Sequence, residues 1–84
     1  MFAVIWREAA LDELADHFVR ADGDRRDQIE RAVLGFNARL ANDPLHFGES
    51  RSGRTRVAVD GRCAIYFRVE DAQQVAVVTH FRTS

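Results

Sequence analysis

The hydrophobic pattern of this chain changes period at its single proline, Pro44. Between residues 8 and 42 the apolar residues recur every three or four positions, which is the spacing of amphipathic helices. After residue 53 apolar and polar residues alternate, which is typical of strands with one buried face. Because proline cannot continue a helix, the helical part should end at Asn42–Pro44. This order predicts an α+β fold.

Two amphipathic helices are expected before Pro44. The first should run from Glu8 to about Ala21, and Gly23 should stop it. The second should begin at Asp24, whose side chain can cap the helix N-terminus. The link between them is so short that the helices must be antiparallel neighbours, with their apolar stripes facing one core. The stripes are Leu11, Leu14, Ala15 and Phe18 in the first helix, and Ile29, Ala32, Val33, Phe36 and Leu40 in the second.

Four segments are predicted to be strands. Residues 2–6 are apolar and include β-branched side chains, so they form the first strand. Residues 54–59, 62–69 and 74–81 alternate and should form an antiparallel meander, whereas residues 45–53 contain two glycines, show no period and are expected to be a loop. The prediction is therefore an N-terminal strand and a helical hairpin packed on a twisted antiparallel sheet, in the order β-α-α-β-β-β.

The register of this meander decides which side chains share a face. A three-residue loop, with Gly61 in the left-handed conformation, would pair Ala58 with Arg62 and Arg56 with Ala64. The valines and Cys63 would then line the core. The opposite face would carry a set of arginines around one aromatic residue: Arg54, Arg56, Arg62, Tyr66 and Arg68.

Length and composition limit the classes of protein that this chain can belong to. With 84 residues it should form one domain, residues 1–84, and no apolar run approaches the length of a membrane helix or a signal peptide. A cytoplasmic protein is therefore expected. Cys63 has no cysteine partner and lies in a strand pattern, which favours a buried thiol. No glycine-rich phosphate loop and no metal-spaced His or Cys set is visible, so neither cofactor nor metal is expected.

The net charge is −1, and all twelve basic side chains are arginine. Arginines that share a face repel one another, so an anionic partner would explain them, and arginines around an aromatic side chain are typical of single-stranded RNA recognition. The other interpretation is a solvated face whose arginines pair with Glu49, Glu70 or Asp71. Glu49 in the loop and His80 on the last strand could act as general base and general acid, although each alone is weak support.

The features that carry a resemblance are the order of the elements, the Asn42–Pro44 break, the Gly48–Arg51 loop and the Arg-rich meander that ends in residues 80–82. In these features the chain resembles the RelE/ParE family of bacterial toxins. The resemblance covers nearly the whole chain. It implies a toxin–antitoxin module. Some toxins of this family cut messenger RNA on the ribosome, and the RNA's own 2′-hydroxyl is the nucleophile that attacks the adjacent phosphate.

The branch that resembles YoeB implies a set of catalytic positions here, namely Glu49, Arg62, His80 and Phe81. Glu49 would accept the 2′-hydroxyl proton, Arg62 with Arg56 would stabilise the phosphorane, and His80 would protonate the leaving oxygen. Phe81 departs from the family's His-Tyr pair, because it has no phenol hydroxyl. The nucleic acid would contact Arg51, Arg54, Arg56, Tyr66, Arg68 and Arg82.

The resemblance leaves other functions open. Relatives that resemble ParE poison DNA gyrase, and the loss of the phenol at Phe81 is also compatible with an inactive member that only binds its antitoxin. The implied partners are a cognate antitoxin together with the ribosome and messenger RNA, or with gyrase instead. An antitoxin would lay a helix or an extended segment over the toxin's apolar grooves.

Overall fold

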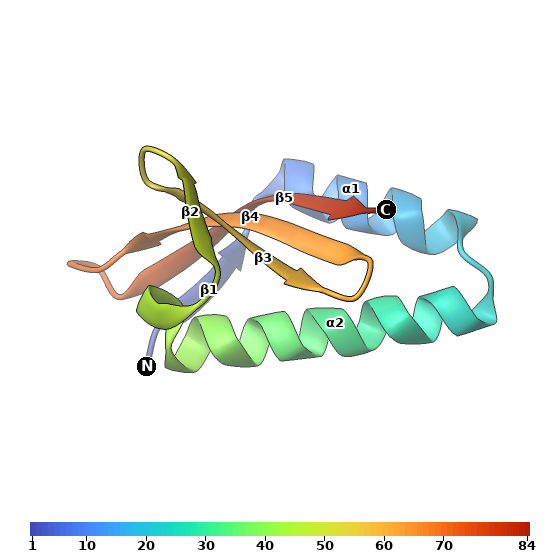
Figure 1. Ribbon diagram of the computed structural model, residues 1–84, viewed down its shortest axis with the longest axis horizontal. Coiled ribbons are helices and arrows are strands. Elements are labelled where there is room, and N and C mark those ends of the chain that lie inside the picture. The colour runs from blue at the N-terminus through green and yellow to red at the C-terminus, as the bar shows by residue number, and fades with distance from the viewer.

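The chain forms one five-stranded sheet with two α-helices, and the computed structural model describes all 84 residues (Figure 1). In chain order the elements are β1 (Ala3–Trp6), α1 (Glu8–Arg20), α2 (Gly23–Asn42), the 3-10 helix η1 (Pro44–His46), β2 (Glu49–Ser52), β3 (Thr55–Asp60), β4 (Cys63–Glu70) and β5 (Val75–Thr83). The strands lie in the order β1-β5-β4-β3-β2. β1 is parallel to β5 and the other pairs are antiparallel, which confirms the predicted α+β fold.

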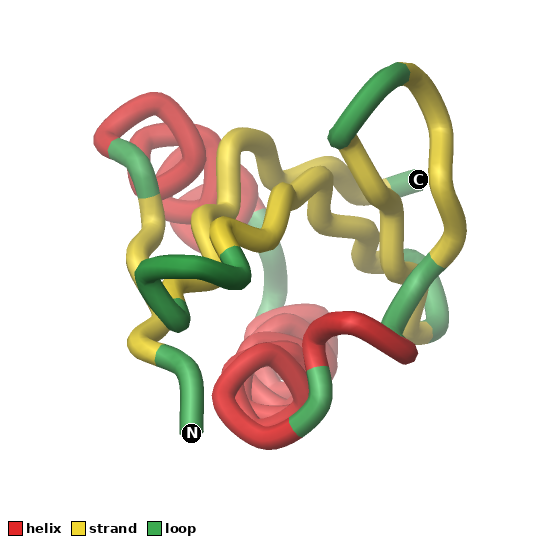
Figure 2. The backbone as a smooth tube through the Cα atoms, turned by 90° about the vertical axis from the view of Figure 1, so that its left-hand side faces the viewer, coloured by secondary structure: helices red, strands yellow, loops and turns green.

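The two faces of the sheet differ in what covers them. Figure 2 shows α2 beneath one face, α1 beside the edge that β1 and β5 form, and the β2–β3 hairpin rising at the other side. The face turned away from α2 has no helix across it. We call it the open face, and its central row of cross-strand neighbours is Glu49, Val57, Tyr66 and His80. Neither helix is long and apolar enough to cross a membrane.

The core lies between α2 and the covered face of the sheet. Ile29, Phe36 and Leu40 of the predicted α2 stripe are buried there. The predicted stripe of α1 behaves differently, because none of its residues is fully buried and Leu11 stays 48% exposed. The one buried residue of α1 is Ala10, which lies outside that stripe. α1 therefore follows its predicted boundaries closely, but only α2 buries most of its predicted stripe. The sheet contributes Ala58, Cys63, Ile65, Phe67, Ala76, Val78 and Phe81 to this core.

The start of α2 differs from the prediction by two residues. The Asp22 carboxylate accepts a hydrogen bond from the backbone N–H of Arg25 at 2.9 Å, so Asp22 and not Asp24 is the N-cap. Gly23 is then the first residue of α2. Arg26 also reaches back and donates to the carbonyls of Phe18 and Val19, which satisfies the C-terminus of α1.

The segment predicted as a loop contains η1 and the edge strand β2. All four residues of β2 are exposed, and it pairs with β3 through its backbone with a register shift between Ser50 and Ser52. An exposed strand has no alternating apolar pattern, so the sequence gives no signal for it. Arg51 is the residue at this irregularity, which limits further pairing at the edge.

The predicted β3–β4 register is wrong. The connection consists of Gly61, at φ +61°, and Arg62, so Asp60 pairs with Cys63 and Val57 pairs with Tyr66. The true register differs from the predicted one by an odd number of residues, and an odd shift moves a strand's side chains to the other face. Ala58 therefore enters the core, and Val59 is 65% exposed.

A bulge in β5 lets both even-numbered and odd-numbered residues of this strand reach the core. Tyr66 pairs with His80, but Phe67 pairs with Val78, so Thr79 is the extra residue. The Thr79 hydroxyl donates to the carbonyl of Tyr66 at 3.2 Å and holds the bulge. His80 therefore points to the open face, whereas Val78 before the bulge and Phe81 after it stay buried.

Gly48 should be essential to the β2–β3 hairpin. Its φ is +74°, and an added Cβ would lie 2.5 Å from the Val57 carbonyl oxygen and 3.1 Å from Phe67 Cε1. We expect Gly48→Ala to lower the free energy of unfolding by about 3 kcal/mol, because backbone strain adds to steric overlap. The control is Gly53→Ala, where φ is +56° and the space is open, and where only the strain of about 1 kcal/mol applies. Urea denaturation measures both, and equal losses would contradict the close approach at Gly48.

Candidate functional site

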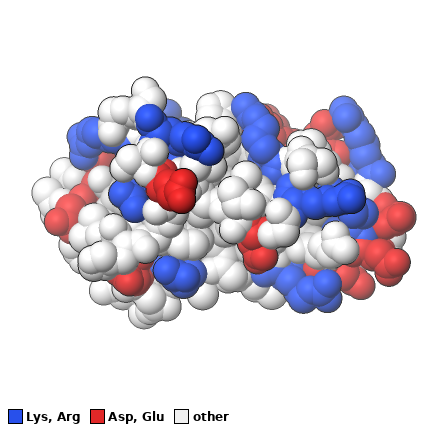
Figure 3. Space-filling view, in the orientation of Figure 1, with Lys and Arg blue, Asp and Glu red and all other residues white.

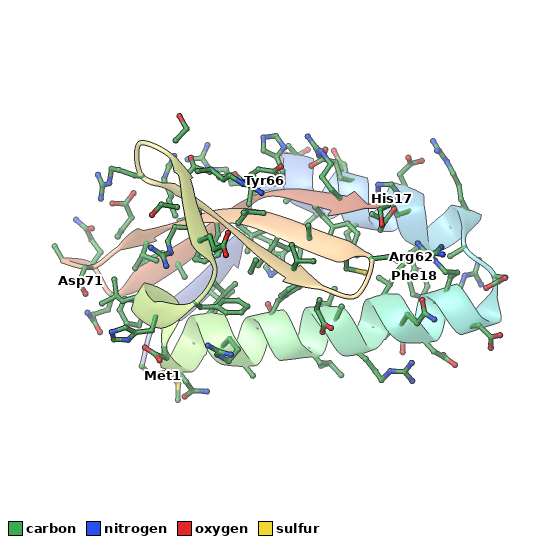
Figure 4. All side chains as sticks on the ribbon, in the orientation of Figure 1. Met1, His17, Phe18, Arg62, Tyr66 and Asp71 are labelled. Carbon is green, nitrogen blue, oxygen red and sulfur yellow. The ribbon has the colours of Figure 1, made fainter.

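Tyr66 and His80 lie side by side on the open face. They are cross-strand partners on β4 and β5, and their rings meet edge to face with centroids 6.2 Å apart. Figure 4 places the Tyr66 side chain on the side of the sheet away from α2. The His80 side chain is 48% exposed, so the imidazole is accessible from this face.

Glu13 of α1 binds the same part of β5. β1 pairs with β5 only as far as Val78, so beyond that residue the edge of β5 faces α1 instead of a strand. Glu13 Oε1 accepts hydrogen bonds from the Phe81 backbone N–H and from His80 Nδ1, both at 3.2 Å. Its Oε2 accepts from the Arg82 guanidinium. One helix side chain thus supplies the acceptor that a neighbouring strand would provide.

Glu13 is ionised at neutral pH. Burial alone would raise its pKa, but the hydrogen bonds from Phe81 and His80 and the positive charge of Arg82 lower the pKa below its usual value of 4.5. An ionised carboxylate accepts hydrogen bonds and cannot donate them. The proton in the contact with His80 must therefore be on Nδ1, and Nε2 is not used in this contact.

Glu13 cannot be recognised as a site residue from the sequence. In the sequence it is one of several acidic residues on the polar face of α1, beside Asp12 and Asp16, and nothing in its spacing distinguishes it. Asp16 pairs with Arg20 on the same helix. The contact with β5 joins residues 67 or more positions apart, so it depends on how α1 packs against the sheet.

The predicted arginine face is largely absent. Arg54 and Arg68 both pair with Glu70, at 2.9 and 3.2 Å, and the Arg68 Nε contact is an ion pair without hydrogen-bond alignment. Arg56 lies on the covered side of the sheet and donates to the carbonyls of Phe47 and Gly48, each at 3.0 Å. Figure 3 shows acidic and basic groups interspersed over the side of the molecule that it depicts.

The four positions implied to be catalytic are not brought together. Glu49 is on the open face in the same row as His80, but three strand spacings separate their backbones, roughly 14 Å. Arg62 is in the β3–β4 turn, away from Tyr66 in Figure 4. The Phe81 ring is fully buried against Trp6 and His17, so it faces the core and not the surface that carries His80.

Three of the residues predicted to contact nucleic acid lie on the open face, on β4 and β5: Tyr66, Arg68 and Arg82. Arg51 projects, exposed, from the edge strand β2. No three His, Cys, Asp or Glu side chains gather as a metal site. The arrangement around His80 offers proton transfer by an imidazole, a flat aromatic ring and a guanidinium.

Glu13 should make the stability of the fold depend on pH. Because its folded pKa is lowered, its stabilising contribution is complete above the unfolded pKa, near 4.5, and is lost as the pH falls through the folded pKa. We expect Glu13→Gln to lower the free energy of unfolding at neutral pH and to reduce the further loss below 4.5. Urea denaturation at a series of pH values tests this.

The control for this test is Asp12→Asn, which removes the same charge from the same helix at a residue without an ion pair or hydrogen bond to β5. It should keep the pH dependence of the unmodified protein. Parallel pH curves for Glu13→Gln and the unmodified protein would show that Glu13 does not contribute in this way.

No protein-family model and no curated protein matches this sequence, but solved structures do. A chain of the RelBE2 toxin–antitoxin complex of Mycobacterium tuberculosis matches with a TM-score of 0.79 at 17% identity, over 99% of this chain and 91% of that one. A chain of the chromosomal ParDE toxin–antitoxin system from P. aeruginosa gives 0.74 at 16%, over 99% and 96%. The isolated RelE toxin of E. coli gives 0.68 at 14%, over 100% and 85%. The chain therefore has the fold of the RelE and ParE toxins.

Proposed function

We propose that this protein is the toxin of a toxin–antitoxin module and that it is an endoribonuclease acting on messenger RNA at the ribosome. The observation that carries the proposal is the His80 imidazole, accessible on the open face and held by Glu13 beside Tyr66. The likeness to RelE and to chains of toxin–antitoxin complexes supports the broader part of the proposal. The activity itself rests on the chemistry of the site.

RNA contains the nucleophile for its own cleavage, so the protein needs to move protons and to stabilise charge on the phosphate. His80 is the group for proton transfer. Tyr66 offers a ring on which a base can stack, and such stacking is typical of single-stranded RNA binding. Arg82 shares Glu13 with His80 and takes the phosphate-binding role that the sequence suggested for Arg62 and Arg56.

We further propose that the cognate antitoxin covers the apolar groove between α1 and α2. The groove is lined by Leu11, Leu14, Ala15, Phe18, Ile29, Glu30 and Val33. Its surface is almost entirely apolar, and exposed apolar surface of this kind marks a binding site in a folded protein. An amphipathic segment of the antitoxin would bury it, and binding only to the folded toxin would raise the toxin's apparent stability.

A second candidate function is poisoning of DNA gyrase. The pairing of Arg54 and Arg68 with Glu70 favours it, because these ion pairs leave less free positive charge on the sheet for RNA. The likeness to a ParDE chain is compatible with this function as well. The separation of Glu49 from His80 also keeps a third function open, that of a family-like protein that binds its antitoxin without catalysis.

A translation extract distinguishes these functions. We expect the purified protein to cleave translated message, and His80→Gln to reduce the rate by about 10²-fold to 10⁴-fold, the contribution of a general acid or base. His46→Gln is the matched control, since His46 is exposed and its side chain hydrogen-bonds to Asp43, outside the site. It should leave cleavage unchanged.

If the message stays intact and the protein causes gyrase-dependent DNA breaks, the ribonuclease proposal is wrong and the protein is a gyrase poison. If the protein shows neither activity but binds an antitoxin tightly, it is a binding protein without catalytic function. Full cleavage by folded His80→Gln would remove His80 from the mechanism even if the protein cuts RNA.

A further inference from the structure

We infer that Glu13 and His80 form a carboxylate–imidazole dyad, in which Glu13 is a positioning residue that holds the Nδ1–H tautomer of His80 and leaves Nε2 free as the general base. The inference rests on the proposed ribonuclease function and gives His80 a different role from the one implied by family resemblance. It also transfers the base function from Glu49 on β2 to His80 on β5, at the opposite side of the open face.

The first step of the argument is the direction of the hydrogen bond. Glu13 Oε1 lies 3.2 Å from His80 Nδ1, and a carboxylate whose pKa is lowered can only accept there. In neutral histidine one ring nitrogen carries the proton and the other is an acceptor. With Nδ1 protonated, the acceptor is Nε2, and no protein group hydrogen-bonds to it.

The second step is the rigidity of the carboxylate. Glu13 is fixed by three hydrogen-bond partners on β5, of which the Phe81 N–H belongs to the backbone of a fully buried residue. Arg82 holds the other oxygen. The carboxylate is therefore anchored by the sheet itself, and it can orient the imidazole without moving when a substrate arrives.

The third step concerns charge after proton transfer. The groups that face His80 are Glu13 from α1, Tyr66 from β4 and Arg82 on its own strand. Glu13 is the anion among them and it contacts the imidazole directly. When Nε2 accepts a proton, the new positive charge on the ring is stabilised by this carboxylate, which is how an acidic partner assists a histidine base.

The reaction that fits this dyad is transesterification within RNA. His80 Nε2 takes the proton of a 2′-hydroxyl, the 2′-oxygen forms a bond to the adjacent phosphorus, and the bond from phosphorus to the 5′-oxygen breaks. The departing 5′-oxygen takes a proton from water. The products are a 2′,3′-cyclic phosphate and a 5′-hydroxyl, and the imidazolium then returns its proton to water. A nucleotide with 2′-hydrogen in place of the hydroxyl should therefore resist cleavage.

Nitrogen NMR of the full-length protein tests the dyad without any substrate. We expect the neutral His80 ring to be protonated on Nδ1 in the unmodified protein, with its signals assigned by their absence in His80→Gln. Glu13→Ala should shift the ring toward the Nε2–H tautomer, and Asp12→Asn should not. A His80 ring protonated on Nε2 in the unmodified protein would overturn the inference, as would an unchanged tautomer in folded Glu13→Ala.

Loss of Glu13 also removes the acceptor of the Phe81 N–H, so Glu13→Ala is at risk of unfolding. Glu13→Gln keeps an amide oxygen for that N–H and serves as the second variant. We expect Glu13→Gln to slow message cleavage at least about tenfold, whereas Glu49→Gln should slow it less. A large loss with Glu49→Gln and none with Glu13→Gln would overturn the base assignment.

The two levels of the proposal fail separately. If the unmodified protein does not cleave message, the proposed function fails, and the base role falls with it. The NMR result then still decides whether Glu13 sets the tautomer of His80. If the protein cleaves message but His80 carries its proton on Nε2, the function stands and the dyad is wrong.

Discussion

The hydrogen bonds between Glu13 and β5 join α1 to the edge of the sheet at the candidate site. β1 is short and stops pairing at Val78, so the rest of β5 would be an open edge. An unpaired strand edge needs hydrogen-bond partners or protection. Glu13 supplies an acceptor to the Phe81 N–H, and the same carboxylate binds two side chains that flank it. The packing of α1 and the geometry of the candidate site are thus one interaction.

Several arginines on the sheet are paired with carboxylates of the protein itself. Glu70 pairs with two arginines, and Glu13 pairs with Arg82 while contacting His80. Arg56 uses its guanidinium to hold the carbonyls that precede β2. A polyanion that binds the open face must therefore compete with these internal partners for part of its contacts. Recognition would depend on the central aromatic and imidazole groups as much as on net positive charge.

The bulge at Thr79 explains how a buried strand presents a functional group. With strict alternation, the buried Val78 would place His80 in the core as well. The extra residue reverses the alternation, so His80 reaches the open face while Phe81 fills the core beside Trp6. The absence of a phenol at Phe81 then matters less for the site than the sequence suggests, because that ring does not reach the open face.

Local periodicity in the sequence was enough to predict most of the helices and strands. The helical spacing between residues 8 and 42, the break at Pro44 and the three alternating runs are local signals, and the elements follow them closely. It could not determine β2, which has no apolar pattern, or the β3–β4 register, where an odd shift reverses every face. The site needed the tertiary structure for the same reason. The contact from Glu13 to His80 exists only when α1 packs on the edge of β5, and residues so far apart leave no trace in local spacing.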